Sequence, residues 1–223
     1  MFNYELDYKK LETFENYHEF KIYLDMCNMT VDFYAKTYCI STFTYHNDGH
    51  LKNYIGYLIP IKNRVFPITH RGDIINLKNC DVIDMFRILG GYGSDTIDTV
   101  PKSVFDFNIM GCKFKKLPTG IKMVIQDYDC SCNQLTSLEG SPTRIGGSFI
   151  CRDNKLTTLV GAPRIVNRDF NCSANELTSL EGAPRIIGGE FSCGNNFKLS
   201  SLRGAPSYIL GTFDTRYMQS KHH

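Results

Sequence analysis

The sequence predicts an α+β protein, in which a small N-terminal α+β domain caps a short solenoid built around a parallel sheet. Cys130, Cys151, Cys172 and Cys193 follow one another at intervals of 21 residues, and a fixed period of this length indicates stacked structural repeats. Glycine is also concentrated in the C-terminal half, where residues 101–223 hold 12 of the 18 glycines. These observations predict a capping domain at 1–100 and a solenoid of about five repeats at 101–217. Residues 218–223 form a tail ending in Lys-His-His, which we interpret as a remnant of an expression tag.

The composition limits the class of protein. With 223 residues and 42% hydrophobic side chains, the chain can bury a core and is too apolar for a disordered protein. A net charge of +2 gives no electrostatic reason to expect a nucleic-acid or membrane partner. The longest apolar stretch, Tyr54–Ile61, has eight residues, against ~20 for a membrane span. The first residues lack the basic and apolar regions of a secretion signal, so we expect a cytoplasmic protein.

Short apolar patterns predict the elements of the N-terminal half. Apolar residues at helical spacing predict one helix within 7–17 and another over 81–89. Between them, β-rich runs at 39–45 and 51–59 flank the sequence Asn47-Asp48-Gly49, which is typical of a β-hairpin turn. Such a domain would cover the first repeat, whose strand otherwise exposes an unpaired edge.

Each repeat predicts a strand and a set of interior columns. Phe149 and Cys151 alternate with Ser148, Ile150 and Arg152, as in a short strand with one buried face. Rows stacked ~4.8 Å apart then form a parallel sheet in which Phe, Cys and Leu line up in buried columns. The Asn that follows each strand, at 133, 154, 175 and 196, is expected to bond backbone groups of its own turn and of adjacent rows.

The rest of each repeat predicts turns. The Gly-Ala-Pro segment after the second leucine is expected to turn the chain on the convex side, because proline cannot belong to a strand ladder. Gly146-Gly147 and Gly188-Gly189 are expected to adopt positive φ angles where the chain re-enters the next strand.

The row F-x-C-x-x-N-x-L-T-x-L-x-G-A-P-x-x-I resembles the leucine-rich repeat, in its short bacterial and viral form. The segment 175–189, N-E-L-T-S-L-E-G-A-P-R-I-I-G-G, is similar to repeat proteins of large tailed bacteriophages. The resemblance covers residues 105–213, and no family is recognised in the N-terminal half. It implies a leucine-rich-repeat solenoid, and a viral protein that binds a host or defence factor in the bacterial cytoplasm.

No catalytic or metal-binding pattern is found in the sequence. Zinc needs four converging ligands, whereas one Cys per repeat gives a line of sulfurs that fills the core. The odd count of nine cysteines also argues against a disulfide framework. The motifs of zinc proteases and of serine hydrolases are missing. The sequence therefore predicts no enzyme, no metal and no cofactor.

The outward residues of the predicted sheet are the candidate binding site, because solenoids typically bind partners along their concave face. This face is polar and mildly acidic, which suits a protein partner with basic or amide groups and disfavours a phosphate backbone. Its predicted residues are Asp127, Asp129, Ser148, Ile150, Arg152, Asp169, Asn171, Glu190, Ser192 and Asp214.

The sequence leaves three alternatives open. The face can simply keep the solenoid soluble. Arg144, Arg164 and Arg185, near the proline of each row, form a convex rim that can bind nucleic acid. Residues 1–100 can hold an enzyme that no motif reveals. The last predicted strand, near Phe213, has no clear cap, so its edge can also pair with a second copy of the chain.

Overall fold

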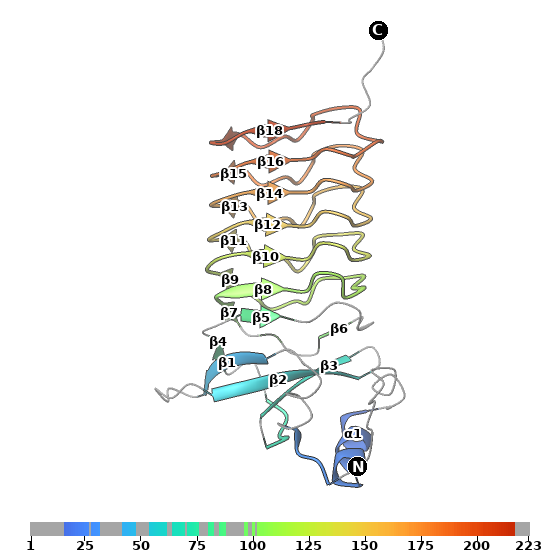
Figure 1. Cartoon of the computed structure of the whole chain (residues 1–223). Coiled ribbons are helices and arrows are strands. Elements are labelled where there is room, and N and C mark those ends of the chain that lie inside the picture. The colour runs from blue at the N-terminus through green and yellow to red at the C-terminus, as the bar shows by residue number, and fades with distance from the viewer. Residues whose placement is uncertain are drawn as a thin grey trace.

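The repeats form a parallel β-solenoid of about five turns, with a helix and a further sheet at its N-terminal end (Figure 1). The computed structural model describes residues 16–26, 28–31, 42–47, 54–61, 64–69, 71–75, 80–82, 85–87, 96–97, 100 and 102–216. Each turn contributes one short strand to each of two parallel sheets, here called sheet B and sheet C.

Sheet B contains the strands that the sequence predicts. Its order is β18-β16-β14-β12-β10-β8-β5, and the register aligns Tyr128, Phe149, Phe170 and Phe191 in adjacent strands, as the 21-residue spacing predicts. In chain order the strands are β5 (Met85–Arg87), β8 (Asp106–Asn108), β10 (Tyr128–Asp129), β12 (Phe149–Ile150), β14 (Phe170–Asn171), β16 (Phe191–Ser192) and β18 (Phe213–Asp214).

Sheet C is a second parallel sheet that the sequence does not predict. It lies where we expected only a convex turn, because each row re-enters a strand directly after its proline. Its order is β17-β15-β13-β11-β9-β7. The strands are β7 (Ser103–Val104), β9 (Met123–Val124), β11 (Arg144–Ile145), β13 (Ile165–Val166), β15 (Ile186–Ile187) and β17 (Tyr208–Ile209). A two-residue strand is too short to show an alternating pattern in the sequence.

The core between the two sheets consists of columns of similar side chains. The aromatic rings of sheet B stack from turn to turn, with centroids 5.1 Å apart for Tyr128 and Phe149 and 5.5 Å apart for Phe149 and Phe170. The Cys and Leu columns lie beside them, with Cys151 and Leu156 fully buried. On the opposite wall, the second residue of each sheet C strand, such as Val166 in β13, points inward. The predicted interior columns are therefore confirmed.

A buried Asn column holds the turns together. The Asn154 amide donates to the carbonyls of Cys130 at 3.0 Å in the previous turn and of Cys151 at 3.1 Å in its own. Its Oδ1 accepts from the Leu135 N–H at 2.9 Å. Asn175 repeats the pattern one turn later. The predicted role of this residue type is confirmed.

The prediction for the paired glycines is wrong. Positive φ angles occur at the glycine of the Gly-Ala-Pro segment, with +92° at Gly161 and +88° at Gly182. Gly146-Gly147 and Gly188-Gly189 are not among the positive-φ glycines. Instead they allow close approach between turns, since a Cβ at Gly188 would lie 2.1 Å from the Asn167 carbonyl oxygen. Glycine is therefore needed at these positions because a side chain would overlap the backbone of the preceding turn.

The N-terminal elements form a third sheet, here called sheet A, with the order β4-β1-β2-β3-β6. Its strands are β1 (Thr42–Asn47), β2 (Tyr54–Ile61), β3 (Arg64–Thr69), β4 (Cys80–Val82) and β6 (Thr96–Ile97), and the helix α1 spans Tyr17–Met26. The predicted antiparallel pairing of the two runs is confirmed, because β1 pairs with β2 and Thr42 lies opposite Tyr57. Of the predicted turn, Asn47 lies in β1, and Asp48 and Gly49 lie outside the described part of the chain. Of the helix predicted within 7–17, residues 7–15 lie outside the described part of the chain.

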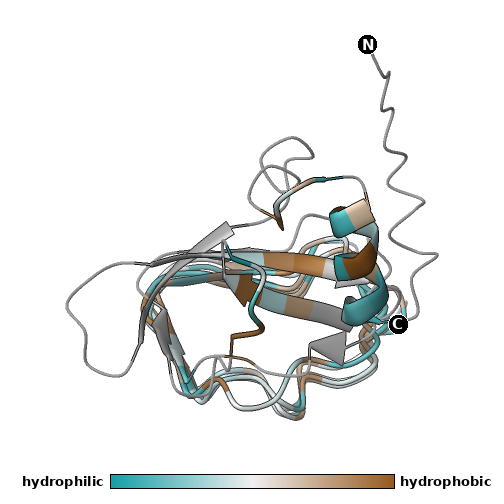
Figure 2. Ribbon diagram, turned by 90° about the horizontal axis from the view of Figure 1, so that it is seen from below, coloured by the Kyte–Doolittle hydropathy of each residue, from teal (hydrophilic) through white to brown (hydrophobic). Residues whose placement is uncertain are grey.

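The helix predicted over 81–89 is wrong. Residues 80–82 form β4 against β1, and residues 85–87 form β5 against β8. Both parts of this segment pair with the edge strand of a sheet, and this tertiary pairing overrides a short apolar pattern at helical spacing. As a result β5 covers the edge of the first sheet B repeat strand. Leu58, Ile75 and Val100 belong to the same apolar core as the repeats, and the N-terminal strands lie across the end of the stack (Figure 2).

Candidate functional site

The ten residues predicted to bind a partner do lie together on the outer face of sheet B, since adjacent turns keep one register. Their polar groups, however, are largely used within the chain. Asp127 Oδ1 accepts from the Ser148 N–H of the next turn at 2.7 Å. Asp169 Oδ1 accepts from the Glu190 N–H in the same way at 2.8 Å. These carboxylates link turns.

Other side chains of this face bond within their own turn. Asp129 Oδ1 accepts from the Ser131 hydroxyl at 2.6 Å, and Asn171 Oδ1 accepts from the Ser173 hydroxyl at 2.6 Å. The Ser192 hydroxyl donates to Glu190 Oε1 at 2.5 Å.

Arg152 and Asp214, on the same face, are also paired with charged neighbours. Arg152 pairs with Asp153 at 2.9 Å. Asp214 accepts from Arg216 at 2.8 Å, and this hydrogen bond holds the pKa of the Asp214 carboxyl below its usual value. Ile150 is half-buried. The face therefore offers few unpaired groups to a partner.

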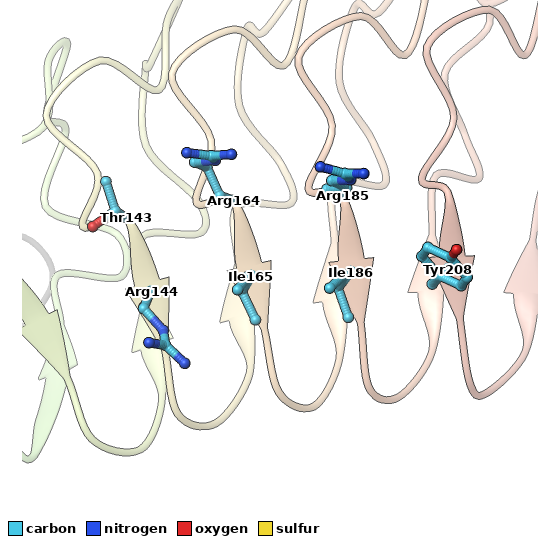
Figure 3. Close-up of a pocket in the computed structure, with 7 residues that line it drawn as sticks. All are labelled: Thr143, Arg144, Arg164, Ile165, Arg185, Ile186 and Tyr208. Carbon is cyan, nitrogen blue, oxygen red and sulfur yellow. The ribbon is translucent and has the colours of Figure 1, made fainter.

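The outer face of sheet C has a different character. A groove of about 540 Å³ runs along four successive strands of this sheet (Figure 3). Its lining residues are Thr143, Arg144, Arg164, Ile165, Arg185, Ile186 and Tyr208. A second hollow of about 420 Å³ continues it toward β9, where Lys122, Met123 and Ile125 join Arg144.

The two-residue strands explain this arrangement. Side chains alternate between the two faces of a strand, so the first residue points outward wherever the second is buried. In β13 and β15 the outward residues are Ile165 and Ile186, and each is preceded by an exposed arginine. Because turns stack ~4.8 Å apart, Arg164 lies beside Arg185 and Ile165 beside Ile186 (Figure 3).

The charge on this surface has a single sign. We call it the cationic–apolar face, formed by the segments 102–105, 122–125, 143–146, 164–167, 185–188 and 207–210. These segments contain no Asp or Glu, and their cations are Lys102, Lys122, Arg144, Arg164 and Arg185. Within the described part of the chain, none of these cations forms an ion pair.

Large apolar side chains lie exposed between these charges. The exposed fractions are 48% for Met123, 37% for Ile186 and 62% for Tyr208. Exposed apolar patches of this kind mark interaction sites more often than scattered single residues do. The sequence pointed to the arginines as a rim at the turns, but missed the apolar residues between them. The available signal was Arg-Ile-Val after Pro163 and Arg-Ile-Ile after Pro184.

The cysteine column offers no reactive thiol. Cys130, Cys151 and Cys172 are fully buried, and this burial raises the pKa of each thiol well above its usual value. The Cys172 thiol donates to the Ser192 carbonyl at 3.4 Å. These thiols are therefore protonated at neutral pH and act as core-filling groups. Among the described cysteines Cys132 is the exposed one, and its Sγ lies 3.9 Å from Asp153 Oδ2.

No protein-family model matches the sequence, and comparisons with curated proteins and with solved structures find no similar protein. None of the helices among the described residues has the length and apolar character needed to cross a bilayer.

Proposed function

We propose that the chain is a non-enzymatic protein-binding module whose cationic–apolar face holds an acidic segment of a partner protein. The observation that carries this proposal is the set of five cations without a carboxylate partner, interleaved with exposed Met123, Ile186 and Tyr208. Residues 1–100 act in this proposal as the cap of the first turn, which keeps that end of the solenoid soluble.

The chemistry of the face selects this class of partner. Arg164 and Arg185 present planar guanidinium groups, which bind carboxylates through two parallel hydrogen bonds. Ile165 and Ile186 between them supply apolar contact, which a purely charged ligand would not use. A segment lying along the solenoid axis would meet a cation about every ~4.8 Å. Complementary acidic and apolar side chains therefore fit this surface.

This proposal moves the binding site from sheet B to sheet C. The carboxylates of Asp127 and Asp169 already bond the next turn, so a partner would compete with the stability of the solenoid for them. The resemblance of the repeats to leucine-rich repeats of bacteriophage proteins favours a bacterial host or defence protein as the partner. On that basis the module would act in the bacterial cytoplasm.

The test is affinity capture from bacterial lysate, followed by mass spectrometry and titration of the captured protein. Charge reversal at Arg144, Arg164 and Arg185 to Glu should abolish capture, because it replaces three attractive contacts with repulsion. A matched control reverses three exposed lysines away from the face, Lys115, Lys116 and Lys155, and should leave capture unchanged. If the first variant still captures the partner, and a variant with Asp127, Asp129 and Asp169 changed to Asn does not, then the binding site lies on sheet B.

Nucleic-acid binding is the second candidate, favoured by the lack of carboxylates on the cationic–apolar face. It requires a steep salt dependence, since each neutralised phosphate contributes a slope of roughly −0.9 to log K against log[salt]. Binding of a labelled 20-mer oligonucleotide should then have a slope of about −4 to −5 if all five cations take part. Absence of binding at low salt removes this candidate and leaves the first one standing.

A further inference from the structure

The last turn of the solenoid exposes side chains that every earlier turn buries. Phe213 ends the aromatic column with 37% of its surface exposed, whereas Phe191, whose ring lies 4.9 Å away, is fully buried. Leu202 is 45% exposed, while its counterpart Leu180 is fully buried. The cross-section of the hydrophobic core is therefore open to solvent at this end.

The backbone at this end also has unused hydrogen-bonding groups. In sheet B, the N–H of each aromatic residue donates to a carbonyl of the following turn, as from Phe170 to Glu190 and from Phe191 to Thr212, both at 2.8 Å. In sheet C the direction reverses, and the Ile187 carbonyl accepts from Leu210 N–H at 3.0 Å. Among the described residues no turn follows β17 and β18, so the corresponding groups of Ile209 and Phe213 lack these partners.

The opposite end of the stack is different. There β5 pairs with β8, and Leu58, Ile75 and Val100 pack into the repeat core. The described solenoid thus has one open end and one covered end. In a head-to-tail arrangement, the open end of one copy would meet the covered end of the next and would gain no stable contact. Head-to-tail filaments are therefore not favoured.

We propose that two copies of this chain associate through the open end, with β18 against β18 and β17 against β17 in antiparallel pairs about a two-fold axis. An occupant of this surface must present two strand edges at the separation of sheets B and C, with an apolar centre between them. A second copy rotated by 180° presents the same two strand edges and the same apolar centre. Rotation reverses the strand direction, and antiparallel edges supply donors and acceptors to each other.

The charges at the rim are also self-complementary. Asp214 and Arg216 lie next to each other at the end of sheet B and pair at 2.8 Å within one chain. In an antiparallel arrangement of β18 with its copy, each chain brings its own Asp214–Arg216 pair, so neither rim of the interface carries an unbalanced charge. An isologous interface requires such a patch, and with one open end the assembly stops at the dimer. The cationic–apolar faces of both copies stay accessible, so this inference does not depend on the proposed function.

Sedimentation equilibrium of the full chain between about 1 and 100 µM tests the proposal. The unmodified chain should be dimeric at the upper concentrations. Phe213→Glu should raise the dimer Kd at least ~100-fold, because it would bury a charge at the centre of the interface. Val160→Glu is the control, since it places the same charge on an exposed apolar side chain two turns before the open end, and should leave the Kd within about threefold.

Hydrogen exchange of the unmodified chain keeps the test decisive if Phe213→Glu fails to fold. The amide of Phe213 should become protected as protein concentration rises, in step with dimer formation, while the amide of Phe191 stays protected throughout. A monomer at 100 µM, or a dimer whose formation leaves the exchange of Phe213 unchanged, would overturn the proposal. So would a dimer that Val160→Glu disrupts and Phe213→Glu leaves intact.

Discussion

Tyr128 stands in the aromatic column where the following turns carry Phe149, Phe170 and Phe191, and its extra hydroxyl lies in the core. The side chain is fully buried, and the hydroxyl has no hydrogen-bond partner among the described residues. Burial, together with the nearby Cys130, raises the pKa of this phenol well above its usual value. A buried polar group without a partner carries a desolvation cost of about 1–3 kcal/mol.

Tyr128→Phe should therefore raise the free energy of unfolding by about 1 kcal/mol. The ring keeps its stacking on Phe107 and Phe149, at centroid distances of 4.8 and 5.1 Å. Urea titration at neutral pH measures the change. Tyr208→Phe serves as the control, because the Tyr208 side chain is 62% exposed and its loss of a hydroxyl should change stability by less than about 0.5 kcal/mol. A destabilised Tyr128→Phe variant would contradict the unpaired state of the hydroxyl.

At this scale, the sequence predicts well what is identical in every row. The Asn and Cys columns follow from spacing alone, because a residue that recurs at one register position meets its own copies when turns stack. The hydrogen bonds of Asp127 and Asp169 did not follow. They depend on which backbone N–H of the next turn comes within 3 Å, and the sequence shows these carboxylates only as exposed acids.

At the scale of elements, the turn between sheets C and B alternates along the solenoid. Two of these turns carry Gly-Gly, at 146–147 and 188–189, and the turn between them carries Asn167-Arg168. The glycines lie against the preceding turn, where Asp127 Oδ1 and Asp169 Oδ1 would be 2.2 and 2.1 Å from a Cβ at Gly147 and Gly189. The glycines thus leave room for the carboxylate of the turn before, which accepts from the N–H of the residue after each glycine pair, Ser148 or Glu190.

Gly188→Ala should destabilise the solenoid by about 2–3 kcal/mol, because its Cβ would overlap backbone and force two turns apart. The contact concerned is to the Asn167 carbonyl oxygen, 2.1 Å from the ideal Cβ position. Thermal or urea unfolding gives the loss.

Asn167→Ala is the matched control, at the same register position one turn earlier with an exposed side chain. It should lie within about 0.5 kcal/mol of the unmodified chain. Equal stability of the two variants would mean that the turns separate without cost, and would remove the steric account of the paired glycines.

The missed elements share one physical cause. The sheet C strands have two residues each, and β4 and β5 have three, so hydrogen bonds to neighbouring turns decide their conformation. Local patterns of this length do not distinguish strand from turn or helix. The cationic–apolar face was hidden for the same reason, since its groove exists only when four such strands lie side by side. The arginines were visible in the sequence, and the surface that they share with Ile165 and Ile186 was not.

At the scale of the whole molecule, the buried cysteines, four of the column and Cys112, couple stability to alkaline pH. Cys112, Cys130, Cys151, Cys172 and Cys193 are all buried. Burial raises the pKa of Cys112 and of Cys193 to about 12, and raises that of the other three well above the usual value. The folded chain therefore keeps protons that the unfolded chain releases above pH ~8.5.

The sign of the pH dependence follows from this difference. Below pH ~8.5 both states hold the thiol protons, and the free energy of unfolding does not depend on them. Above it the unfolded state binds fewer protons, so stability falls by up to ~1.4 kcal/mol per pH unit for each thiol until the folded pKa is reached. Five such thiols together would remove up to about 7 kcal/mol per pH unit. That is comparable to the whole stability of a typical domain.

We therefore expect unchanged urea midpoints between pH 7 and 8, and a steep decline between pH 9 and 10.5. Cys151→Val, which keeps an apolar side chain in the column, should reduce the slope above pH 9 by about 1.4 kcal/mol per pH unit. Cys132→Ser is the control, because Cys132 is exposed and lies outside the buried column; this variant should keep the full slope. A flat stability profile up to pH 10.5 would show that the cysteine thiols are open to solvent. It would then also contradict the stacked core, which sets the geometry of the two outer faces and of the open end.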